Sequence, residues 1–279
     1  MLKLIGVELY KIYTKPRSYL GLLAITIIVC LIHIAMYSGG QEYLDFIFAT
    51  FKDSFDVSGK ILTGNLIAFI ILQMLVVQMP LLVAFVTGDI ISGEASGGTL
   101  RILAGKPYSR SHIFFSKFIA CAIYTFVLVV WLGILAVVLG HLLFGSGDMM
   151  VLKTEGLVVL RDGDILWRYG YAFIIAFFIL LLIASLAFCI SSFAENSITP
   201  IVITMGLIII STVIGTLEVP LFEYIKPILF TTHMIIWRNM FDKPVPWNDI
   251  LLSMSIVFSY TCLFTGIAWF HFTRKDILT

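Results

Sequence analysis

The polar residues best able to do specific chemistry lie in one segment between two long apolar runs. This segment, Gly88–Arg110, reads GDIISGEASGGTLRILAGKPYSR. Asp89 and Glu94 can form charge-assisted hydrogen bonds, and Gly97 and Gly98 permit a tight turn. A turn between two membrane helices does not need so long or so specific a loop. We therefore expect a short helix that a cytosolic partner binds. The alternative is a loop that only joins two helices.

The residues after the two glycines extend this interpretation. Thr99 can cap the segment that follows it, and Leu100 begins an apolar ridge for a partner. Charged groups at Arg101 and Arg110, together with Glu94, can hold the loop rigid, so that it transmits motion instead of absorbing it. The complete predicted coupling set is Asp89, Glu94, Gly97, Gly98, Thr99, Leu100, Arg101, Pro107, Ser109 and Arg110.

The composition predicts an all-α membrane protein. Apolar residues make up 60% of the 279 residues and charged residues only 13%, about half of what a soluble domain carries. A transmembrane helix needs about 20 apolar residues, and the continuous runs do not alternate as β-barrel strands do. We expect one domain, residues 1–279, with six transmembrane helices at about 19–37, 61–86, 113–144, 169–193, 198–217 and 250–272.

The first 16 residues predict an interfacial helix that Pro16 ends. The alternative is a basic tail that only sets the topology. On a helical wheel two faces separate: Leu2, Ile5, Leu9, Ile12 and Tyr13 share one, and Glu8, Lys11 and Lys15 lie opposite. We expect the apolar face to enter the membrane and the charged face to lie at the headgroups.

The distribution of Lys and Arg predicts the orientation. The N-terminus, the loop after the second span and the C-terminus carry more bases than acids, whereas the other loops are rich in acids. We therefore expect both termini in the cytosol and the chain in a bacterial or archaeal plasma membrane. The net charge of +1 gives no reason to expect a nucleic-acid partner.

The interiors of the spans contain no central charged residue. This argues against proton or sodium coupling, which usually needs an ionisable group at mid-membrane. Lys117 and Glu195 are expected near the cytosolic ends, where long side chains reach the headgroups. The polar residues inside the spans either tie helices together or line a substrate path: Asn65, Gln73, Gln78, Thr204, Ser211 and Thr212.

Motifs of ATP-hydrolysing and other soluble enzymes are missing. The glycines at Gly97 and Gly98 are not followed by Lys-Ser or Lys-Thr, and there is no H-E-x-x-H or G-x-S-x-G. The four cysteines show no metal-ligand spacing. We therefore expect no enzyme activity, no metal and no cofactor in this chain. Any ATP and Mg²⁺ would belong to a separate subunit.

Two motifs resemble the permease subunits of ABC-2 type, or type V, exporters. The first is the loop with Asp89, Glu94, Gly98-Thr99-Leu100 and Pro107-x-Ser109-Arg110, followed by Lys117. The second is the C-terminal Phe272-Thr273-Arg274-Lys275-Asp276-Ile277, in which Lys275 replaces the family's second Arg.

The resemblance implies a function and a set of partners. It implies a permease that forms the translocation path and is driven by a soluble ATP-binding-cassette ATPase. A second copy of the chain, or a related permease, would complete the transporter within the lipid bilayer. The alternative is a membrane scaffold or regulatory module that uses the loop to recruit a cytosolic protein without transport.

Overall fold

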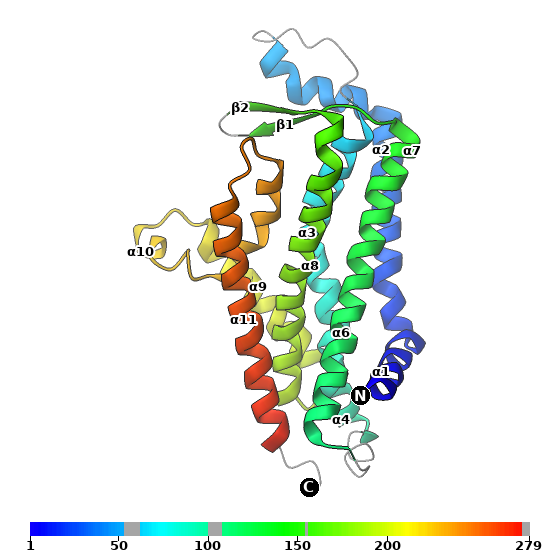
Figure 1. The fold of residues 1–279 in the computed structure, drawn as a ribbon, viewed down its shortest axis with the longest axis vertical. Helices are drawn as coiled ribbons and strands as arrows, with labels where there is room; N and C mark the ends of the chain where they lie inside the picture. Colours follow the sequence, from blue (N-terminus) through cyan, green and yellow to red (C-terminus); the bar gives the residue numbers. More distant parts are fainter. Residues whose placement is uncertain (53–61, 100–107, 154–155, 275–279) are drawn as a thin grey trace.

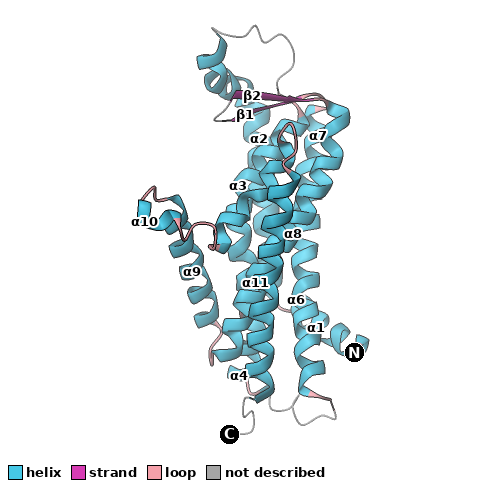
Figure 2. Cartoon of the chain, turned by 60° about the vertical axis from the view of Figure 1, so that its left-hand side comes forward, coloured by secondary structure: helices cyan, strands magenta, loops and turns pink. Residues whose placement is uncertain are grey.

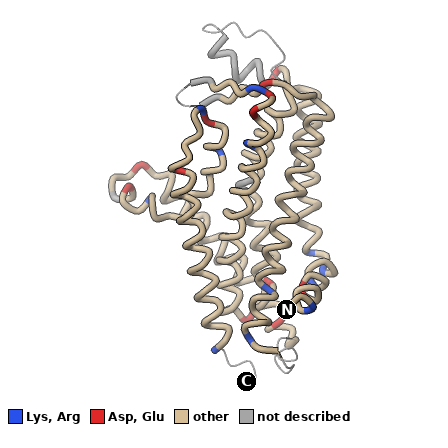
Figure 3. Tube along the Cα trace, in the orientation of Figure 1, with Lys and Arg blue, Asp and Glu red and all other residues tan. Residues whose placement is uncertain are grey.

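The chain forms an elongated helical bundle with both ends of the chain at one end of the molecule (Figure 1). The structure is a computed structural model and describes residues 1–52, 62–99, 108–153 and 156–274. Charged residues gather at the two ends of the bundle and on the projecting segment around α10. The middle of the bundle is almost free of them (Figure 3). We call the end with α1 (Leu2–Thr14) the terminal end, and the opposite end, which carries the two strands Met149–Lys153 and Gly156–Leu160, the hairpin end (Figure 1).

Helices α1 and α2 form an L at the terminal end. α1 (Leu2–Thr14) ends before Lys15, which is extended, and α2 (Pro16–Lys52) begins at the proline. Proline disfavours helical geometry in the residue before it and is well accepted at a first helical position, so the Lys-Pro pair produces this break. The predicted end of the first helix at Pro16 is confirmed.

The next part of the chain runs from the hairpin end to the terminal end and returns (Figure 1). α3 (Gly64–Thr87) starts at Thr63, whose hydroxyl accepts a hydrogen bond from the Leu66 amide at 3.3 Å, and is followed by the short α4 (Asp89–Ser96). The return path consists of α6 (Arg110–Gly133), the π-helical η1 (Ile134–Val138) and α7 (Leu139–Phe144).

The second half of the chain is built around α8 (Asp162–Phe193). This helix packs against α3, α6, α9 (Ile198–Thr216) and α11 (Trp247–Arg274). Between the last two, α10 (Pro220–Glu223) projects sideways and the 3₁₀ helix η2 (Phe230–Phe241) returns to the bundle (Figure 2). Trp237 and Phe241 of η2 are buried against Phe69 of α3.

Among the described residues, six helical stretches are long and apolar enough to cross a membrane, which is the predicted number. They are Pro16–Glu42, Gln78–Ser96, Arg110–Phe144, Asp162–Phe193, Ile198–Thr216 and Trp247–Arg274, and a shorter apolar stretch, Gly64–Leu75, occupies the first half of α3. The molecule is therefore a multi-pass membrane protein by length and composition.

The prediction of an all-α chain is wrong in one respect. An antiparallel pair of strands, β1 (Met149–Lys153) and β2 (Gly156–Leu160), crosses the hairpin end. Its Val- and Leu-rich sequence suits a half-buried ladder. Two helices also exceed the predicted spans. α2 continues to Lys52 because no proline follows Pro16 within it, and α8 starts at Asp162 because acids in its first turn favour a helix start.

Candidate functional site

The short helix α4 is the element that the polar segment of the sequence predicts. It continues from α3 through Gly88 and ends at Gly97. Gly98 has φ = 68°, which a glycine adopts without strain, so the predicted tight turn is confirmed there, whereas Gly97 is ordinary helical backbone. The predicted coupling residues Leu100, Arg101 and Pro107 lie outside the described residues.

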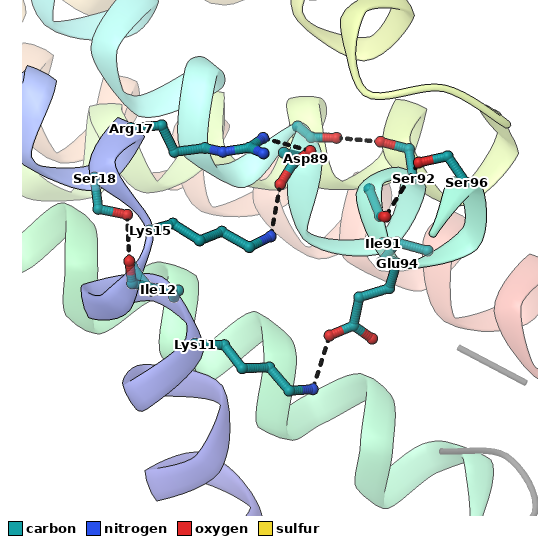
Figure 4. Close-up of polar contacts among 12 residues, drawn as sticks. Lys11, Ile12, Lys15, Arg17, Ser18, Asp89, Ile91, Ser92, Glu94 and Ser96 are labelled. Carbon is teal, nitrogen blue, oxygen red and sulfur yellow. Dashed lines mark hydrogen bonds and ion pairs between the residues drawn. The ribbon is translucent and has the colours of Figure 1, made fainter. Parts of the chain in front are cut away.

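Glu94 on α4 is at the centre of an ion network (Figure 4). Its carboxylate oxygens lie 2.6 Å from Lys117 Nζ of α6 and 2.8 Å from Lys11 Nζ of α1. Glu8 of α1 bridges the same two lysines, at 2.8 Å from Lys117 and 2.9 Å from Lys11. Two acids and two bases therefore alternate around a closed ring that joins α1, α4 and α6.

Lys117 is the most buried member of this ring, with 0% of its side chain exposed. The expectation that it extends toward the headgroups is wrong, because its ammonium is held inside the protein by two carboxylates. An ammonium ion without a partner would be very costly at such a position. The bundle can therefore bury Lys117 only while both α1 and α4 are docked.

The polar face of α1 is turned inward, contrary to the predicted position at the headgroups. Glu8 is 4% exposed, and Lys11 reaches from the same face to the ring. Burial tends to lower the pKa of Lys11, but its hydrogen bonds to Glu94 and Glu8 outweigh this, so the pKa is raised above its usual value. Lys11 therefore stays charged, and its ion pairs stay formed, throughout the neutral pH range.

Asp89 makes a second attachment between α4 and the N-terminal segment. Its carboxylate, 2% exposed, lies 3.0 Å from Lys15 Nζ and 2.5 Å from the Arg17 guanidinium (Figure 4). Gly93 is required beside it, because a Cβ at Gly93 would collide with this carboxylate. The L formed by α1 and α2 thus holds α4 at both of its acidic residues.

The central helix α8 provides a third attachment for α4. The Ser191 hydroxyl accepts hydrogen bonds from the backbone amides of Ile91 and Ser92, at 3.3 and 3.0 Å. The Ile91 amide lies in the first turn of α4, where amides have no partner within the helix, so Ser191 supplies an acceptor for it. The Ser92 hydroxyl donates to the Gly88 carbonyl at 2.8 Å.

The remaining described coupling candidates have different roles. The Ser109 hydroxyl caps α6 through the His112 amide at 3.3 Å, and the Arg110 guanidinium donates to the Thr273 carbonyl near the end of α11 at 3.0 Å. Thr99 donates to the Glu94 carbonyl at 3.4 Å, which continues the turn after α4. Ser109 and Arg110 therefore fix the start of α6 and not α4 itself.

The six candidates for a substrate path do not form one cluster. Asn65 is 1% exposed, and its amide donates to the Gly147 carbonyl and to Asp162 at the hairpin end. Thr204 is buried and donates to Pro200, and Ser211 is hydrogen-bonded to Thr231. Asn65 and Ser211 therefore tie separate segments of the chain together, whereas the hydrogen bond of Thr204 stays within α9.

The other three candidates are on the surface of the single chain. Gln73 and Gln78 are exposed on α3, and Thr212 is exposed on α9, although its hydroxyl donates to the Ile208 carbonyl. Helices α3 and α9 pack against each other. The exposed surfaces of α3 and α9 therefore contain the candidates still able to meet a ligand, although Gln73 and Gln78 lie about 140° apart around α3.

Sequence reasoning named most of the site's charged members outside α4, Lys117 among them, but did not predict that they meet the acids of α4. Glu8, Lys11, Lys15, Arg17 and Lys117 all have ordinary interfacial patterns in the sequence. The signal that could have predicted these contacts is the match between the charged face of α1 and the acids of the polar segment. Within the described ranges, no group of three or more His, Cys, Asp or Glu side chains could hold a metal ion.

Fold and site together define a class: a multi-pass helical membrane protein with a short, ion-paired helix anchored at its terminal end. The chain belongs to the family described as Protein of unknown function (DUF2705), whose model matches residues 21–278. It is also similar to the uncharacterized protein YhcI of Bacillus subtilis strain 168, with 23% identity over 203 residues. That match covers 69% of this chain and 62% of the length of YhcI, so the chain spans less than two thirds of its relative.

Proposed function

We propose that this chain is the membrane-spanning permease subunit of an ATP-binding-cassette exporter of the ABC-2 type. The observation that carries the proposal is α4. This helix lies at one end of the bundle, is bound to α1, α2, α6 and α8, and keeps Ser96 exposed at its end. A rigidly held helix can pass a push from a cytosolic protein into several spans at once.

The ion-paired ring determines which helices would move together with α4. Its members are Glu8, Lys11, Glu94 and Lys117. Each ion pair joins α1 or α4 to another element, except for the Lys11–Glu8 pair within α1. A displacement of α4 therefore pulls on α6 through Lys117 and on α1 through Lys11. In the proposed exporter, ATP-driven closure of the ATPase subunits moves these helices and changes the path between two permease chains.

The proposal assigns ATP and Mg²⁺ to a separate ATPase subunit, since the chain has no P-loop motif. A second copy of the chain, or a related permease, completes the path. Only 17% of the apolar stretch in α9 and 17% of that in α11 are buried in the single chain, so ample apolar surface remains for lipid and for such a partner.

The test is co-purification followed by site-specific cross-linking. The tagged chain, purified in mild detergent from its own organism, should bring with it an ABC ATPase. In a cysteine-free background, Ser96→Cys on the exposed end of α4 should cross-link to that ATPase. The matched control is Thr14→Cys, an exposed residue at the end of α1, which should cross-link much less.

Two outcomes would count against the proposal. If no ATPase co-purifies and Ser96→Cys captures another cytosolic protein, the chain is a scaffold or regulatory module. If Ser96→Cys and Thr14→Cys cross-link to the ATPase equally, α4 is not the contact that drives the permease.

A further inference from the structure

An apolar cleft opens between α6 and α8 in the half of the bundle nearest the hairpin. These helices lie side by side (Figure 1). The cleft has a volume of about 420 Å³, within the usual range of small-ligand pockets. Its lining is Phe126, Val129, Val130, Gly133, Ile134, Val137, Val138, Leu166, Tyr169, Gly170, Phe173, Ile174 and Phe177.

The lining offers no polar group to a ligand. Tyr169 is the one residue of the set with a polar side chain, and its hydroxyl donates to the Asn65 carbonyl at 2.6 Å, away from the cleft. Water has no hydrogen-bonding partner in such a cleft, so an apolar ligand is the suitable occupant.

Glycines and a change of helix type shape the cleft. Phe173 forms part of the floor beside Gly133, where even a Cβ would lie 3.3 Å from the Phe173 ring. Gly170 leaves open space, because a Cβ there would meet nothing within 4 Å. Along the other wall, the chain changes from α- to π-helix at Ile134–Val138, a local form that is frequent at functional sites.

The position of the cleft along the helices identifies the ligand. Its inner end is the pair Phe126 and Phe177, whose rings meet edge to face at 5.6 Å. From Leu166 to Phe177 the helix rises about 16 Å, roughly half of the 30 Å hydrocarbon core. The length of the cleft along the helices therefore matches the thickness of one leaflet of the bilayer.

Aromatic side chains mark its other end as the membrane surface. Trp167, Tyr171 and Trp247 form one cluster, with Trp167 and Trp247 stacked at 6.5 Å. Trp and Tyr collect at the level of the lipid headgroups. Leu166 at the mouth of the cleft is adjacent to this cluster, so the cleft begins at the headgroups and ends at mid-membrane.

We propose that this cleft binds one acyl chain of a bilayer phospholipid from the leaflet at the hairpin end. Val130, Ile134 and Ile174 on the rim are 41%, 47% and 55% exposed, so a chain can enter sideways from the bilayer. The bound acyl chain lies along the cleft, and the headgroup of the lipid lies beside Trp167 and Tyr171. This proposal depends on the membrane placement of the spans and not on the proposed export function.

The test uses photoreactive lipid in vesicles of phosphatidylethanolamine and phosphatidylglycerol that contain the purified chain. The probe is phosphatidylcholine with a diazirine either at the end of one acyl chain or near its carbonyl. We expect the chain-end probe to label Phe126 and Phe177 and the carbonyl probe to label Val138 and Leu166. Both should label the cleft severalfold more strongly than the exposed face of α9.

A variant whose larger side chain fills the cleft is compared with a variant that carries the same change elsewhere on the surface. Gly170→Leu should reduce this labelling severalfold, whereas Gly266→Leu, at an exposed position in the second half of α11 and equally free of neighbours, should not. Should Gly170→Leu fail to fold, Ile174→Trp narrows the cleft from its exposed rim.

Three results would overturn the proposal. They are equal labelling of the cleft and of α9, labelling that filling the cleft leaves unchanged, and an inverted order of the two probes, which would place the lipid in the other leaflet. Cross-links between two chains through Ile134→Cys, together with no lipid labelling, would show that a protein helix occupies the cleft instead.

Discussion

At the residue scale, the stability of the terminal end of the bundle depends on Lys117. It is fully buried between Glu8 and Glu94, and these two acids belong to helices that lie far apart in the sequence. A buried charge pair that has lost one partner is costly, because the other charge stays desolvated.

Lys117→Met should therefore destabilise the protein by about 3–5 kcal/mol, since two carboxylates would share only Lys11. The measurement is thermal unfolding of the purified protein in detergent. Lys3→Met is the control, because Lys3 is exposed on α1 and should have almost no effect.

A double variant separates charge from packing. Lys117→Met combined with Glu94→Gln removes one negative charge together with the positive one, so it should recover part of the loss. Non-additivity of this kind is expected for residues in one network. If the double variant instead loses as much stability as the two single variants added together, Lys117 acts by packing alone.

The sequence identified one half of this site and not the other. Asp89 and Glu94 are conspicuous because they interrupt an apolar chain. Lys117 was assigned to the headgroups because a lysine near the end of a span normally extends there. Its partner Glu8 is 109 positions away, and a single sequence contains no signal for a contact at that separation.

At the element scale, α4 is held by its neighbours more than by its own eight residues. An isolated helix of this length is not stable in water. Its amides are satisfied by Ser191 of α8, and its acids by α1, α2 and α6. Loosening one attachment should therefore loosen α4 without unfolding the bundle.

Ser191→Ala should increase hydrogen exchange of the α4 amides, because Ile91 and Ser92 lose their acceptor. Each net hydrogen bond stabilises by about 1 kcal/mol, so exchange should rise by several-fold to tenfold. Mass spectrometry of exchanged peptides measures this effect.

Ser185→Ala is the control on the same helix. Its hydroxyl is buried but donates to the Leu182 carbonyl within α8, so its loss should leave α4 unchanged. Equal exchange of α4 in both variants would show that Ser191 does not anchor it.

Element boundaries were predictable where local chemistry sets them. Pro16 located the helix break and the apolar runs gave the number of spans, but the predicted second span, 61–86, differs from the stretch found, Gln78–Ser96. The inward charged face of α1 was not predictable, because the same amphipathic pattern suits a helix on the headgroups and a helix on a charged protein surface. The β1–β2 pair was not predicted, although its sequence carries a hairpin signal: two four-residue apolar runs, 149–152 and 157–160, separated by a polar segment that ends in glycine.

At the scale of the whole molecule, the terminal end and the hairpin end should lie on opposite sides of the membrane. The bases of the terminal end predict that it is cytosolic. Single cysteines at Ser96 and at Gly163, both exposed, test this in a cysteine-free background. In intact cells an impermeant thiol reagent should label Gly163→Cys and leave Ser96→Cys unlabelled until the membrane is opened. Labelling of Ser96→Cys from outside would reverse the proposed topology.

The two exposed glutamines of α3 set the last expectation. An amide in contact with hydrocarbon is unfavourable, so Gln73 and Gln78, both exposed, need a polar environment that the described part of the chain does not supply. A second permease chain facing α3 and α9 would enclose them. They would then line a largely apolar cavity suited to an amphipathic or lipidic cargo.

Gln73→Leu keeps a similar bulk and removes the amide. In the proposed exporter it should therefore change the cargo response and leave assembly and basal ATP hydrolysis intact. The measurement is ATP hydrolysis by the reconstituted complex with and without candidate lipidic or amphipathic cargo. Ser259→Leu, at an exposed position of α11 whose native hydroxyl donates to its own helix, is the control and should respond like the unmodified protein. If Gln73→Leu instead lowers the melting temperature and the surviving complex responds normally, Gln73 joins helices and the path lies elsewhere.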